Sequence, residues 1–492
     1  MSPRINFLGD FRNIQIANKE VKNMNLPIEF ETRMTALLGG EYEAFYEALC
    51  HENAVKGLRV NTNKVSVEAF TQNAPFPMTA IDYVKGGFIV SEDAQAGKNP
   101  YHHAGAYYMQ DPGAMASVAA LPDALREQKS LKILDVCAAP GGKTTQLAAL
   151  CRPMGGAVVA NEYVSARSRI LAGNVERMGL DNVCVLNVDS KYLAEWYPAL
   201  FDLVAVDAPC SGEGMYRKTD LAITEWSPEN VKMCAARQEE ILENAAKTVA
   251  PNGYLLYSTC TYSLEENEET VAAFLDRHCD FSLCKVSDAV IAHTADGIDV
   301  THGKYPELIN CRRFYPHLSP GEGQFVALLR RDADASVGKK PVKDAFTTLG
   351  KNDRAVAEAY CRETVGRVPT GLGFCGSNVI AFEAHETLGI PLPPFGVVAA
   401  GVALGEVRKG RIVPHHHFFM AYGAEFLNKC LLDPNDSSVE RYLAGEEIDV
   451  SNTSNGLTAL CLSMGDAQIS LGGGKLVGGR LKNYYPKGLR AR

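Results

Sequence analysis

The strongest constraint on the fold is the regular alternation of apolar, strand-length segments and helical segments between residues 131 and 260. Near-continuous apolar strands separated by helices are typical of a parallel sheet that is covered on both faces. This region therefore predicts a doubly wound, Rossmann-like α/β domain, with a further strand pair around QFVALLRR (324–331). The predicted strands are KILDVCA, GAVVANE, NVCVLNVD, FDLVAVDAP and GYLLYSTC, and the helices between them are TTQLAALC, SARSRILAGNVERMG and VKMCAARQEEILENAAKTV.

The flanking segments have different patterns and divide the chain into four expected domains. Residues 24–105 combine the helical FETRMTALLGGEYEAFYEAL with the strand-like GLRVNT, which predicts a small α+β module before the α/β domain at 106–331. A charged, proline-containing linker follows at 330–344. Residues 345–430 mix helix and strand signals, and 431–492 are predicted to form a small β-rich domain. Residues 1–23 have no clear periodicity, and Met24 is an alternative start.

Composition excludes several classes of protein. The 492 residues are 46% hydrophobic and 22% charged, which excludes a disordered chain, and no apolar stretch reaches the ~18 residues of a membrane span. The 14 cysteines include no C-x-x-C pair, so we expect no zinc site and no other metal. No secretory signal is present, which predicts free thiols in the reducing cytoplasm. The net charge of −9 argues against a uniformly basic nucleic-acid-binding surface.

In a doubly wound sheet, ligands bind beyond the carboxyl ends of the strands. The first strand leads into DVCAAPGGKT (135–144), a glycine-rich turn that opens a helix and offers free N–H groups. The G-x-G-x-x-G pattern is absent, because Cys137 and Ala139 stand where its first glycines would fall. The phosphate-loop pattern fails only at Cys137, and LVAVD (203–207) resembles the strand that ends in a magnesium-binding Asp. A nucleotide hydrolase therefore stays open as an alternative.

Acceptor side chains follow the next two strands. Glu162 ends the second strand, where a carboxylate can accept hydrogen bonds from both ribose hydroxyls, although a helix-terminal acid is an equal alternative. Asp189 ends the third strand, where it could accept from an adenine amino group. Together with the glycine turn, these residues favour an adenosine-containing ligand without a triphosphate. S-adenosylmethionine fits that pattern better than ATP.

Two cysteines follow the fourth and fifth strands. DAPCSGEG places Cys210 three residues after Asp207, and STCTYS places Cys260 after Ser258 and Thr259. Neighbouring strands would bring the two thiols side by side at the ligand-binding edge of the sheet. A single buried cysteine is most often a packing residue, but two at equivalent strand ends favour a chemical role.

The segments CAAPGGKT, DAPCSGEG and STCTYSLEENE resemble the RNA cytosine-C5 methyltransferases of the Nop/Sun class, and within it the RsmF-type bacterial ribosomal RNA enzymes. The resemblance covers nearly everything from Met24 onward, including YYMQDPGAM (107–115), RFYPHLSPGEGQFVALL (313–329) and KNYYPKGLR (482–490). It implies an S-adenosylmethionine-dependent methyltransferase domain, an N-terminal RNA-binding module and a C-terminal PUA-like RNA-binding domain.

The resemblance also implies the role of each site residue. Cys260 is the nucleophile that adds to C6 of cytosine and makes C5 nucleophilic. Asp207 binds N3 and supplies a proton, and Cys210 assists loss of the C5 proton and release of the product. Lys143 is expected between the cofactor and Asp207, and a surface lysine at the end of the helix is the alternative. The residues expected at the cofactor are Cys137, Ala138, Ala139, Pro140, Gly141, Gly142, Lys143, Glu162, Arg167, Asp189, Asp207 and Pro209.

A basic tail is the expected RNA contact. Residues 470–492 contain lysines, arginines and two adjacent tyrosines but no acidic residue, a pattern that combines phosphate neutralisation with base stacking. A flexible basic end is the alternative. The expected RNA-binding residues are Lys475, Arg480, Lys482, Tyr484, Tyr485, Lys487 and Arg490 in the tail, with Arg217, Lys218, Arg312 and Arg313 near the active centre.

Three other features have simpler interpretations. His415–His417 resembles a metal motif, but it has no acidic or cysteine partner nearby and is expected in a strand, in a structural role or in RNA contact. The acids Glu265, Glu266, Glu268 and Glu269 are expected to form a solvated helix start. Trp196 and Trp226 are expected in the core.

The sequence thus predicts a cytoplasmic, monomeric methyltransferase without a metal, which modifies C5 of cytosine in small-subunit ribosomal RNA. Two alternatives stay open: the nucleotide hydrolase, and a non-catalytic RNA-binding or assembly factor on a methyltransferase scaffold. The presence of both thiols and of the acceptor residues argues against the second alternative.

Overall fold

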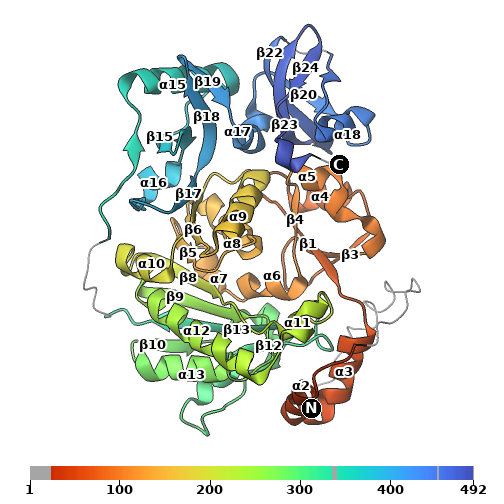
Figure 1. The fold of residues 1–492 in the computed structure, drawn as a ribbon, viewed down its shortest axis with the longest axis vertical. Helices are drawn as coiled ribbons and strands as arrows, with labels where there is room; N and C mark the ends of the chain where they lie inside the picture. The colour runs from red at the N-terminus through yellow and green to blue at the C-terminus, as the bar shows by residue number, and fades with distance from the viewer. Residues whose placement is uncertain (1–23, 335–340, 452–453, 491–492) are drawn as a thin grey trace.

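The computed structural model describes residues 24–334, 341–451 and 454–490, so residues 1–23 and the centre of the predicted linker lie outside it. The described residues form four β-sheets, of which the largest has ten strands (Figure 1). The two sheets of the C-terminal half lie next to each other at one end of the molecule. Within these ranges, no helix combines the length and the apolar character needed to cross a membrane.

The N-terminal module is an antiparallel sheet preceded by two helices. Its elements are α2 (Ile28–Leu38), α3 (Tyr42–His51), β1 (Lys56–Val60), α4 (Val67–Gln72), β2 (Met78–Ala80), β3 (Gly87–Val90), α5 (Pro100–His103) and β4 (Tyr107–Met109). The strand order is β2-β3-β1-β4. Because β4 pairs with β1, the boundary expected after residue 105 separates this sheet from its last strand. The helices α2 and α3 pack away from the sheet, where Phe45 meets Tyr262 of the central domain edge-on.

The central domain contains the predicted alternation of strands and helices. Its elements are α6 (Pro112–Ala119), α7 (Asp123–Arg126), β5 (Lys132–Asp135), α8 (Gly142–Cys151), β6 (Ala157–Asn161), α9 (Ser165–Met178), β7 (Val183–Leu186), α10 (Ser190–Trp196), β8 (Phe201–Asp207), α11 (Asp220–Thr224), α12 (Pro228–Ala246), β9 (Val249–Thr259), α13 (Glu268–Arg277), β10 (Phe281–Cys284), α14 (Asp288–Ile291), β11 (Ala295–Asp296), β12 (Arg312–Phe314) and β13 (Gln324–Arg331). The five predicted strands pair in parallel in the order β7-β6-β5-β8-β9. The sheet is mixed, because β13 and the strands beyond it are antiparallel.

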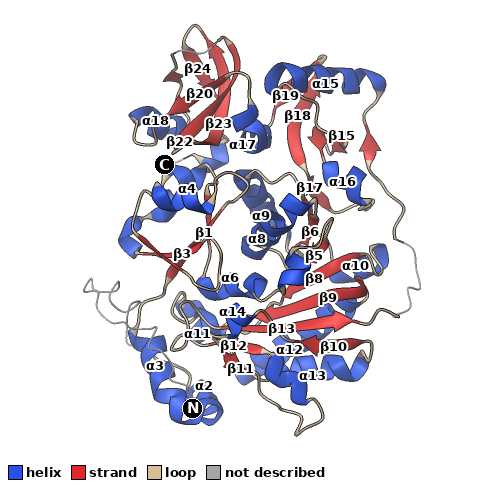
Figure 2. Ribbon diagram, turned by 180° about the vertical axis from the view of Figure 1, so that it is seen from behind, coloured by secondary structure: helices blue, strands red, loops and turns tan. Residues whose placement is uncertain are grey.

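Both faces of this sheet are buried, which explains why its strands are apolar throughout. Along β8, Val204 and Val206 join one hydrophobic core while Leu203 and Ala205 join another, as the period-two alternation of a strand requires. Helices α10, α12 and α13 cover the first face, and α8 and α9 cover the second (Figure 2). Trp196 and Trp226 are buried, which confirms the expectation for both.

The third segment forms its own sheet but also contributes a strand to the central one. Its elements are β14 (Thr347–Thr348), α15 (Lys351–Val365), β15 (Leu372–Cys375), β16 (Asn378–Ala381), α16 (Glu383–Leu388), β17 (Val397–Ala400), β18 (Val402–Arg408), β19 (Arg411–Pro414) and α17 (His416–Tyr422). Five of its strands follow the order β14-β15-β16-β18-β19. The remaining strand, β17, pairs antiparallel with β7 and becomes the outer strand of the central sheet.

The expected strand at His415–His417 is wrong, because these residues start helix α17. His415 is the N-cap, and its ring accepts a hydrogen bond from the backbone N–H of His417. The Nε2 atom of the His417 side chain lies 3.1 Å from the carbonyl oxygen of Leu180 in the central domain. These histidines therefore cap the helix and attach it to the central domain.

The last domain is β-rich, as predicted. Its elements are β20 (Lys429–Leu432), α18 (Ser437–Ala444), β21 (Ile448–Asp449), β22 (Gly456–Met464), β23 (Ala467–Val477) and β24 (Arg480–Asn483). The sheet order is β20-β22-β23-β24-β21. The basic tail lies largely within β23 and β24, so the alternative of a flexible end is wrong for this part of it.

Candidate active site

The glycine-rich turn after β5 is fixed by side chains of α9. Gly141 has a φ of +115°, which favours glycine, and it precedes the free N–H groups at the start of α8. Arg167 Nη2 donates to the carbonyl oxygen of Ala139 at 2.8 Å, and Asn174 Nδ2 donates to that of Pro140 at 2.8 Å. Arg167, which was expected at the cofactor, thus holds the turn itself.

Asp135, at the end of β5, carries an unsatisfied acceptor. Thr144 Oγ1 donates to Asp135 Oδ2 at 2.7 Å, whereas the buried Oδ1 has no hydrogen-bond partner among the described residues. Burial raises the pKa of this carboxyl to about 7. A buried acceptor without a partner is costly unless a ligand donates to it, so Asp135 suits a ligand with a polar or cationic group.

A cleft of about 200 Å³ lies between the glycine turn and the residues that follow the N-terminal sheet. Gln110 is held in its wall, because its Oε1 accepts from Arg59 Nε at 3.1 Å and its Nε2 donates to Gln146 Oε1 at 3.2 Å. The cleft brings together several predicted cofactor residues with a wall from the N-terminal module. It is lined by Tyr108, Met109, Gln110, Asp111, Ala114, Asp135, Cys137, Ala138, Ala139, Pro140, Gly142, Lys143 and Asp207.

Glu162, Asp189 and Pro209 were expected at the cofactor but do not line this cleft. Glu162 follows β6, is buried, and accepts a hydrogen bond from the N–H of Val164 at 2.9 Å. Arg167 Nη1 lies 3.6 Å from Glu162 Oε2. Asp189 is the N-cap of α10 and accepts from the N–H of Lys191 at 3.0 Å. Glu162 follows β6, the neighbour of β5, and Asp189 follows β7, one strand further out; both already have partners within the chain.

Asp207 occupies the end of β8 and joins the glycine turn to the strand that precedes Cys260. Lys143 Nζ lies 2.7 Å from Asp207 Oδ1, and Ser258 Oγ donates to the same oxygen at 2.8 Å. Lys143 is almost entirely buried, whereas the Asp207 side chain is 37% exposed. Asp207 is therefore held from two sides and still open toward a ligand.

The structure brings the two candidate cysteines together. Asp207 and Ser258 are paired across β8 and β9, and Cys210 Sγ lies 3.3 Å from Cys260 Sγ. Both side chains are half-buried. The hydrogen bond with Cys260, followed by burial, raises the pKa of the Cys210 thiol well above its usual value. The two thiols are thus close enough for either one to donate to the other, so a proton can be relayed between them.

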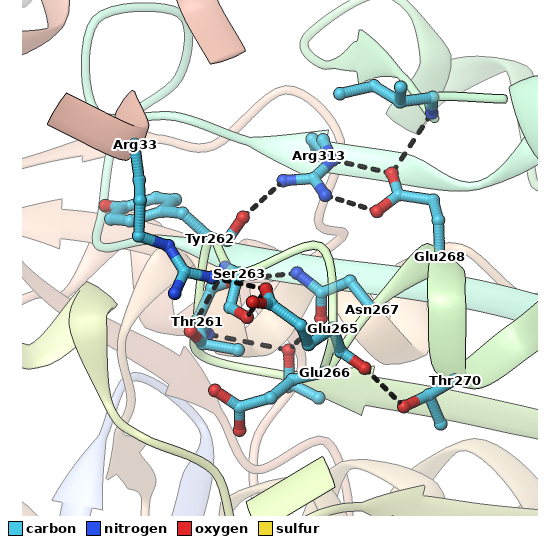
Figure 3. A network of polar contacts seen from close by, with 12 residues as sticks. Arg33, Thr261, Tyr262, Ser263, Glu265, Glu266, Asn267, Glu268, Thr270 and Arg313 are labelled. Carbon is cyan, nitrogen blue, oxygen red and sulfur yellow. Dashed lines mark hydrogen bonds and ion pairs between the residues drawn. The ribbon is translucent and has the colours of Figure 1, made fainter. Parts of the chain in front are cut away.

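The acidic segment after Cys260 was expected to be solvated, and that expectation is wrong for two of its members. Glu266 and Glu268 are fully buried, whereas Glu269 is exposed. Glu268 forms a two-point ion pair with Arg313, with an Nε–Oε1 distance of 2.6 Å (Figure 3). Glu265 pairs with Arg33 of α2, so the segment connects three parts of the chain.

The arginines expected to contact RNA near the active centre are also buried. Arg217 pairs with Glu322 at 2.9 Å, and both side chains are 3% exposed. Arg313 pairs with Glu268, and Arg312 pairs with Asp296. These arginines hold loops in place and do not form an accessible RNA surface. Lys218, the remaining residue expected to contact RNA near the active centre, is partly exposed, and its Nζ lies 2.8 Å from Asp111 Oδ2.

The tail residues differ among themselves. Tyr485 is buried, where its ring packs against Tyr442, so a base-stacking role for it is wrong. Lys475 and Lys482 are exposed and directly opposite each other across β23 and β24. Neither lysine has a carboxylate partner in the part of the chain that the structure describes. Among the other tail residues, Lys487 and Arg480 are exposed, Arg480 pairs with Glu447, and Tyr484 and Arg490 are partly buried.

No group of three or more histidine, cysteine or acidic side chains within the described ranges is arranged to hold a metal ion.

Several residues of the site were missed by the sequence analysis, namely Asp135, Gln110, Ser258, Glu213 and Glu266. Asp135 and Gln110 lie in the motifs DVCAAPGGKT and YYMQDPGAM, and these motifs were the sequence signal that could have indicated them. Ser258, Glu213 and Glu266 lie in quoted motifs as well, but their partners are far away in the sequence, so the motifs did not show what these side chains bind.

Comparisons with known proteins cover almost the whole chain. Family models match residues 26–112 (N-terminal domain of 16S rRNA methyltransferase RsmF), 122–330 (16S rRNA methyltransferase RsmB/F) and 430–491 (methyltransferase RsmF PUA domain). A ribosomal RNA small subunit methyltransferase F from Vibrio vulnificus is 31% identical over 490 residues, which is 95% of this chain and 98% of that protein. The chain belongs to the RsmF family. A ribosomal RNA small subunit methyltransferase F from Aeromonas salmonicida is 30% identical over 485 residues, which is 95% of this chain and 98% of that protein.

Membership of the RsmF family confirms the resemblance drawn from the motifs and selects the methyltransferase interpretation over the nucleotide hydrolase.

Solved structures support the fold. A methyltransferase homolog from Pyrococcus horikoshii is 29% identical with a TM-score of 0.53, and the match covers 62% of this chain and 95% of the other. NSun6 from the same organism, solved with SFG, has a TM-score of 0.51 at 21% identity and covers 63% of this chain and 99% of its own.

Proposed function

We propose that this RsmF-family chain transfers a methyl group from S-adenosylmethionine to C5 of a cytosine in small-subunit ribosomal RNA, through a covalent bond between Cys260 Sγ and C6. The observation that carries the proposal is the 3.3 Å separation of the Cys210 and Cys260 thiols beside Asp207. Small-subunit ribosomal RNA as the substrate follows from the family. The reaction is assigned to the cytoplasm and to a single copy of the chain.

The residues around the glycine turn fit S-adenosylmethionine. Asp135 Oδ1 is a buried acceptor at the cleft with no hydrogen-bond partner in the described part of the chain, which suits a cationic group. The N–H groups at the start of α8 follow the turn, and Glu162 and Asp189 are acceptors at the ends of the next two strands of the sheet, β6 and β7. The bound cofactor supplies an electrophilic methyl group on a sulfonium. Lys143 is bonded to Asp207 and lines the same cleft, so it connects the cofactor site with the base site.

The chemistry follows from the poor nucleophilicity of C5. The Cys260 thiol releases its proton, the resulting thiolate adds to C6 and forms an S–C6 bond, and Asp207, held by Lys143 and Ser258, relays the released proton to N3, which balances the addition. C5 would then take the methyl group as the sulfonium S–CH3 bond breaks and S-adenosylhomocysteine leaves with the electron pair, and the C5–H proton would pass to solvent. Cys210, in contact with Cys260, assists this proton loss, after which the S–C6 bond breaks and restores the free thiol. A base inside a folded RNA must be unstacked to reach these side chains.

The C-terminal domain supplies an RNA contact in this proposal. Lys475 and Lys482 are like charges placed directly opposite each other, an arrangement that costs stability unless an anion is bound. A phosphate between them would relieve that repulsion and release counterions. The exposed Lys487 lies in the segment that follows β24.

The test is the trapping of the covalent intermediate. We expect Cys210→Ala to accumulate an RNA–protein adduct that survives a denaturing gel, because the adduct forms but its release is slow. We expect Cys260→Ala to form no adduct and to transfer no methyl group. Cys279→Ala is the matched control, because that thiol is exposed and remote in sequence from both turns. Methyl transfer by Cys260→Ala would overturn the proposal, and so would the absence of methyl transfer to ribosomal RNA by the wild-type protein.

A further inference from the structure

Two buried glutamates cross-connect the turns that carry the two cysteines. The first cysteine turn comprises residues 207–215 and contains Cys210 and Glu213, and the second comprises residues 258–267 and contains Cys260 and Glu266. The side chains of Glu213 and Glu266 are almost completely buried. Each reaches from its own turn to the other, so the two form a reciprocal pair.

Glu266 binds the first turn immediately next to Cys210. Its Oε2 accepts from the backbone N–H of Ser211 at 3.0 Å and from Gln238 Nε2 at 2.8 Å. Its Oε1 accepts from the hydroxyl of Ser211. Gln238 also donates to the carbonyl oxygen of Pro209 at 2.9 Å, so both residues that flank Cys210 are fixed.

Glu213 binds the second turn immediately after Cys260. Its Oε2 accepts from Thr261 Oγ1 and from the N–H of Tyr262, both at 2.8 Å, and its Oε1 accepts from Trp226 Nε1 at 2.8 Å. The N–H of Gly214 donates to the carbonyl oxygen of Cys260 at 2.8 Å. The hydroxyls of Ser211 and Thr261, which follow the two cysteines, lie 2.9 Å apart.

We infer that Glu213 and Glu266 are positioning residues that hold the Cys210 and Cys260 thiols at the separation and orientation needed for the two-cysteine reaction. The inference rests on the proposed function for its catalytic meaning, and on geometry alone for the positioning itself. Burying two carboxylates is unfavourable, and the bonds of Glu266 to Ser211 and of Glu213 to Thr261 and Tyr262 oppose that cost only while the turns stay together. Loss of either glutamate therefore removes its side-chain connection between the two turns.

The two glutamates differ in how they tolerate conversion to glutamine. Glu266 Oε1 faces only a hydroxyl, which can rotate and accept from an amide, so Glu266→Gln keeps all its contacts. Glu213 faces Trp226 Nε1 on one oxygen and the N–H of Tyr262 on the other, and both groups can only donate. An amide at residue 213 must oppose one of them, so Glu213→Gln breaks the connection. A general need for bulk or polarity at these positions would not produce this difference.

The first experiment measures positioning without RNA or cofactor. Diamide, a two-electron oxidant, takes the two thiol hydrogens while a disulfide forms between Cys210 and Cys260, and peptide mass spectrometry gives the rate. We expect a rate at least ~10-fold lower in Glu266→Ala and Glu213→Gln, and a near wild-type rate in Glu266→Gln. Glu269→Ala is the control from the same acidic segment, because its side chain is exposed. Wild-type rates in both Glu266→Ala and Glu213→Gln would overturn the inference.

The second experiment links positioning to turnover. In single-turnover methyl transfer, we expect Glu266→Ala to lower the rate constant by roughly 10- to 100-fold, with the Kd for S-adenosylmethionine and for RNA unchanged and with recovery in Glu266→Gln. An equal loss in Glu266→Ala and Glu266→Gln, or a loss confined to binding, would contradict the inference. If Glu266→Ala does not fold, Ser211→Ala removes the hydroxyl contacts with Glu266 and Thr261, keeps the backbone N–H bond to Glu266, and must slow disulfide formation. A wild-type chain inactive on RNA would refute the proposed function, while the diamide rates would still decide the inference.

Discussion

Replacing Arg313 by alanine tests whether this arginine stabilises the fold or binds RNA. The side chains of Arg313 and Glu268 are 3% and 0% exposed, so the substitution leaves a carboxylate in the interior without its cation. It also removes the donor to the carbonyl oxygen of Tyr262, at 2.8 Å. Breaking one partner of a buried ion pair costs about 3–5 kcal/mol, which corresponds to a Tm lower by roughly 6–20 °C for a domain of this size class.

The assay is thermal unfolding followed by fluorescence, with RNA binding measured at a temperature where both proteins are folded. Arg330→Ala is the matched control, because Arg330 lies on the same region of the sheet but is exposed, and it should change Tm little. The double variant Arg313→Met/Glu268→Leu should recover most of the loss, since apolar residues of similar volume avoid the unpaired charge. An unchanged Tm together with weaker RNA binding by Arg313→Ala would refute this reasoning.

Three further predictions concern the site and the C-terminal domain. Lys143→Met, which releases Asp207, should lower kcat at least ~10-fold in a methyl-transfer assay, and full activity would argue against the connection between them. Lys475→Gln/Lys482→Gln should weaken RNA binding and reduce the slope of log affinity against log salt by about 1.4–1.8, and an unchanged slope would place the phosphate contacts elsewhere. Burial raises the pKa of Asp135 to about 7, so between about pH 4 and pH 7 the folded chain holds a proton that the unfolded chain has lost. The free energy of unfolding of the cofactor-free protein should therefore fall as pH rises through that interval, by up to about 4 kcal/mol from this group, and an equal fall in Asp135→Asn would contradict this assignment.

The central strands could be predicted because their burial on both faces leaves a local signature. KILD and FDLVAVD are apolar at positions facing either core, and each ends at a polar or glycine-rich turn. The alignment of β8 with β9 then places Cys210 and Cys260 together, so their proximity follows from two local patterns and one topological rule.

Features that depend on distant pairing had no such signature. Glu266 lies just before α13 and Glu268 begins it, a place where acidic residues are usually solvated, and only their contacts with Ser211 and Arg313 explain their burial. Arg217 was interpreted as a surface cation for the same reason, since Glu322 is far from it in sequence. In each case a charge pattern was visible, but its partner was not.

Deletion of the basic tail, residues 470–492, would not be a clean test of its role in RNA binding. Removal of residues 470–492 would delete most of β23 and all of β24, with the buried Leu471, Leu476 and Leu481. Weaker RNA binding after that deletion would therefore report an unfolded domain. Substitution of the exposed lysines separates charge from folding.

The strand β17 has a consequence for any attempt to study the catalytic domain alone. A chain ending at the linker would lack Val397–Ala400 and would leave β7 with a row of unpaired N–H and C=O groups along its edge. Because β7 is apolar on both faces, that edge would be a template for pairing between molecules and for aggregation. A soluble fragment will thus require either the segment through Ala400 or a charged substitution in β7.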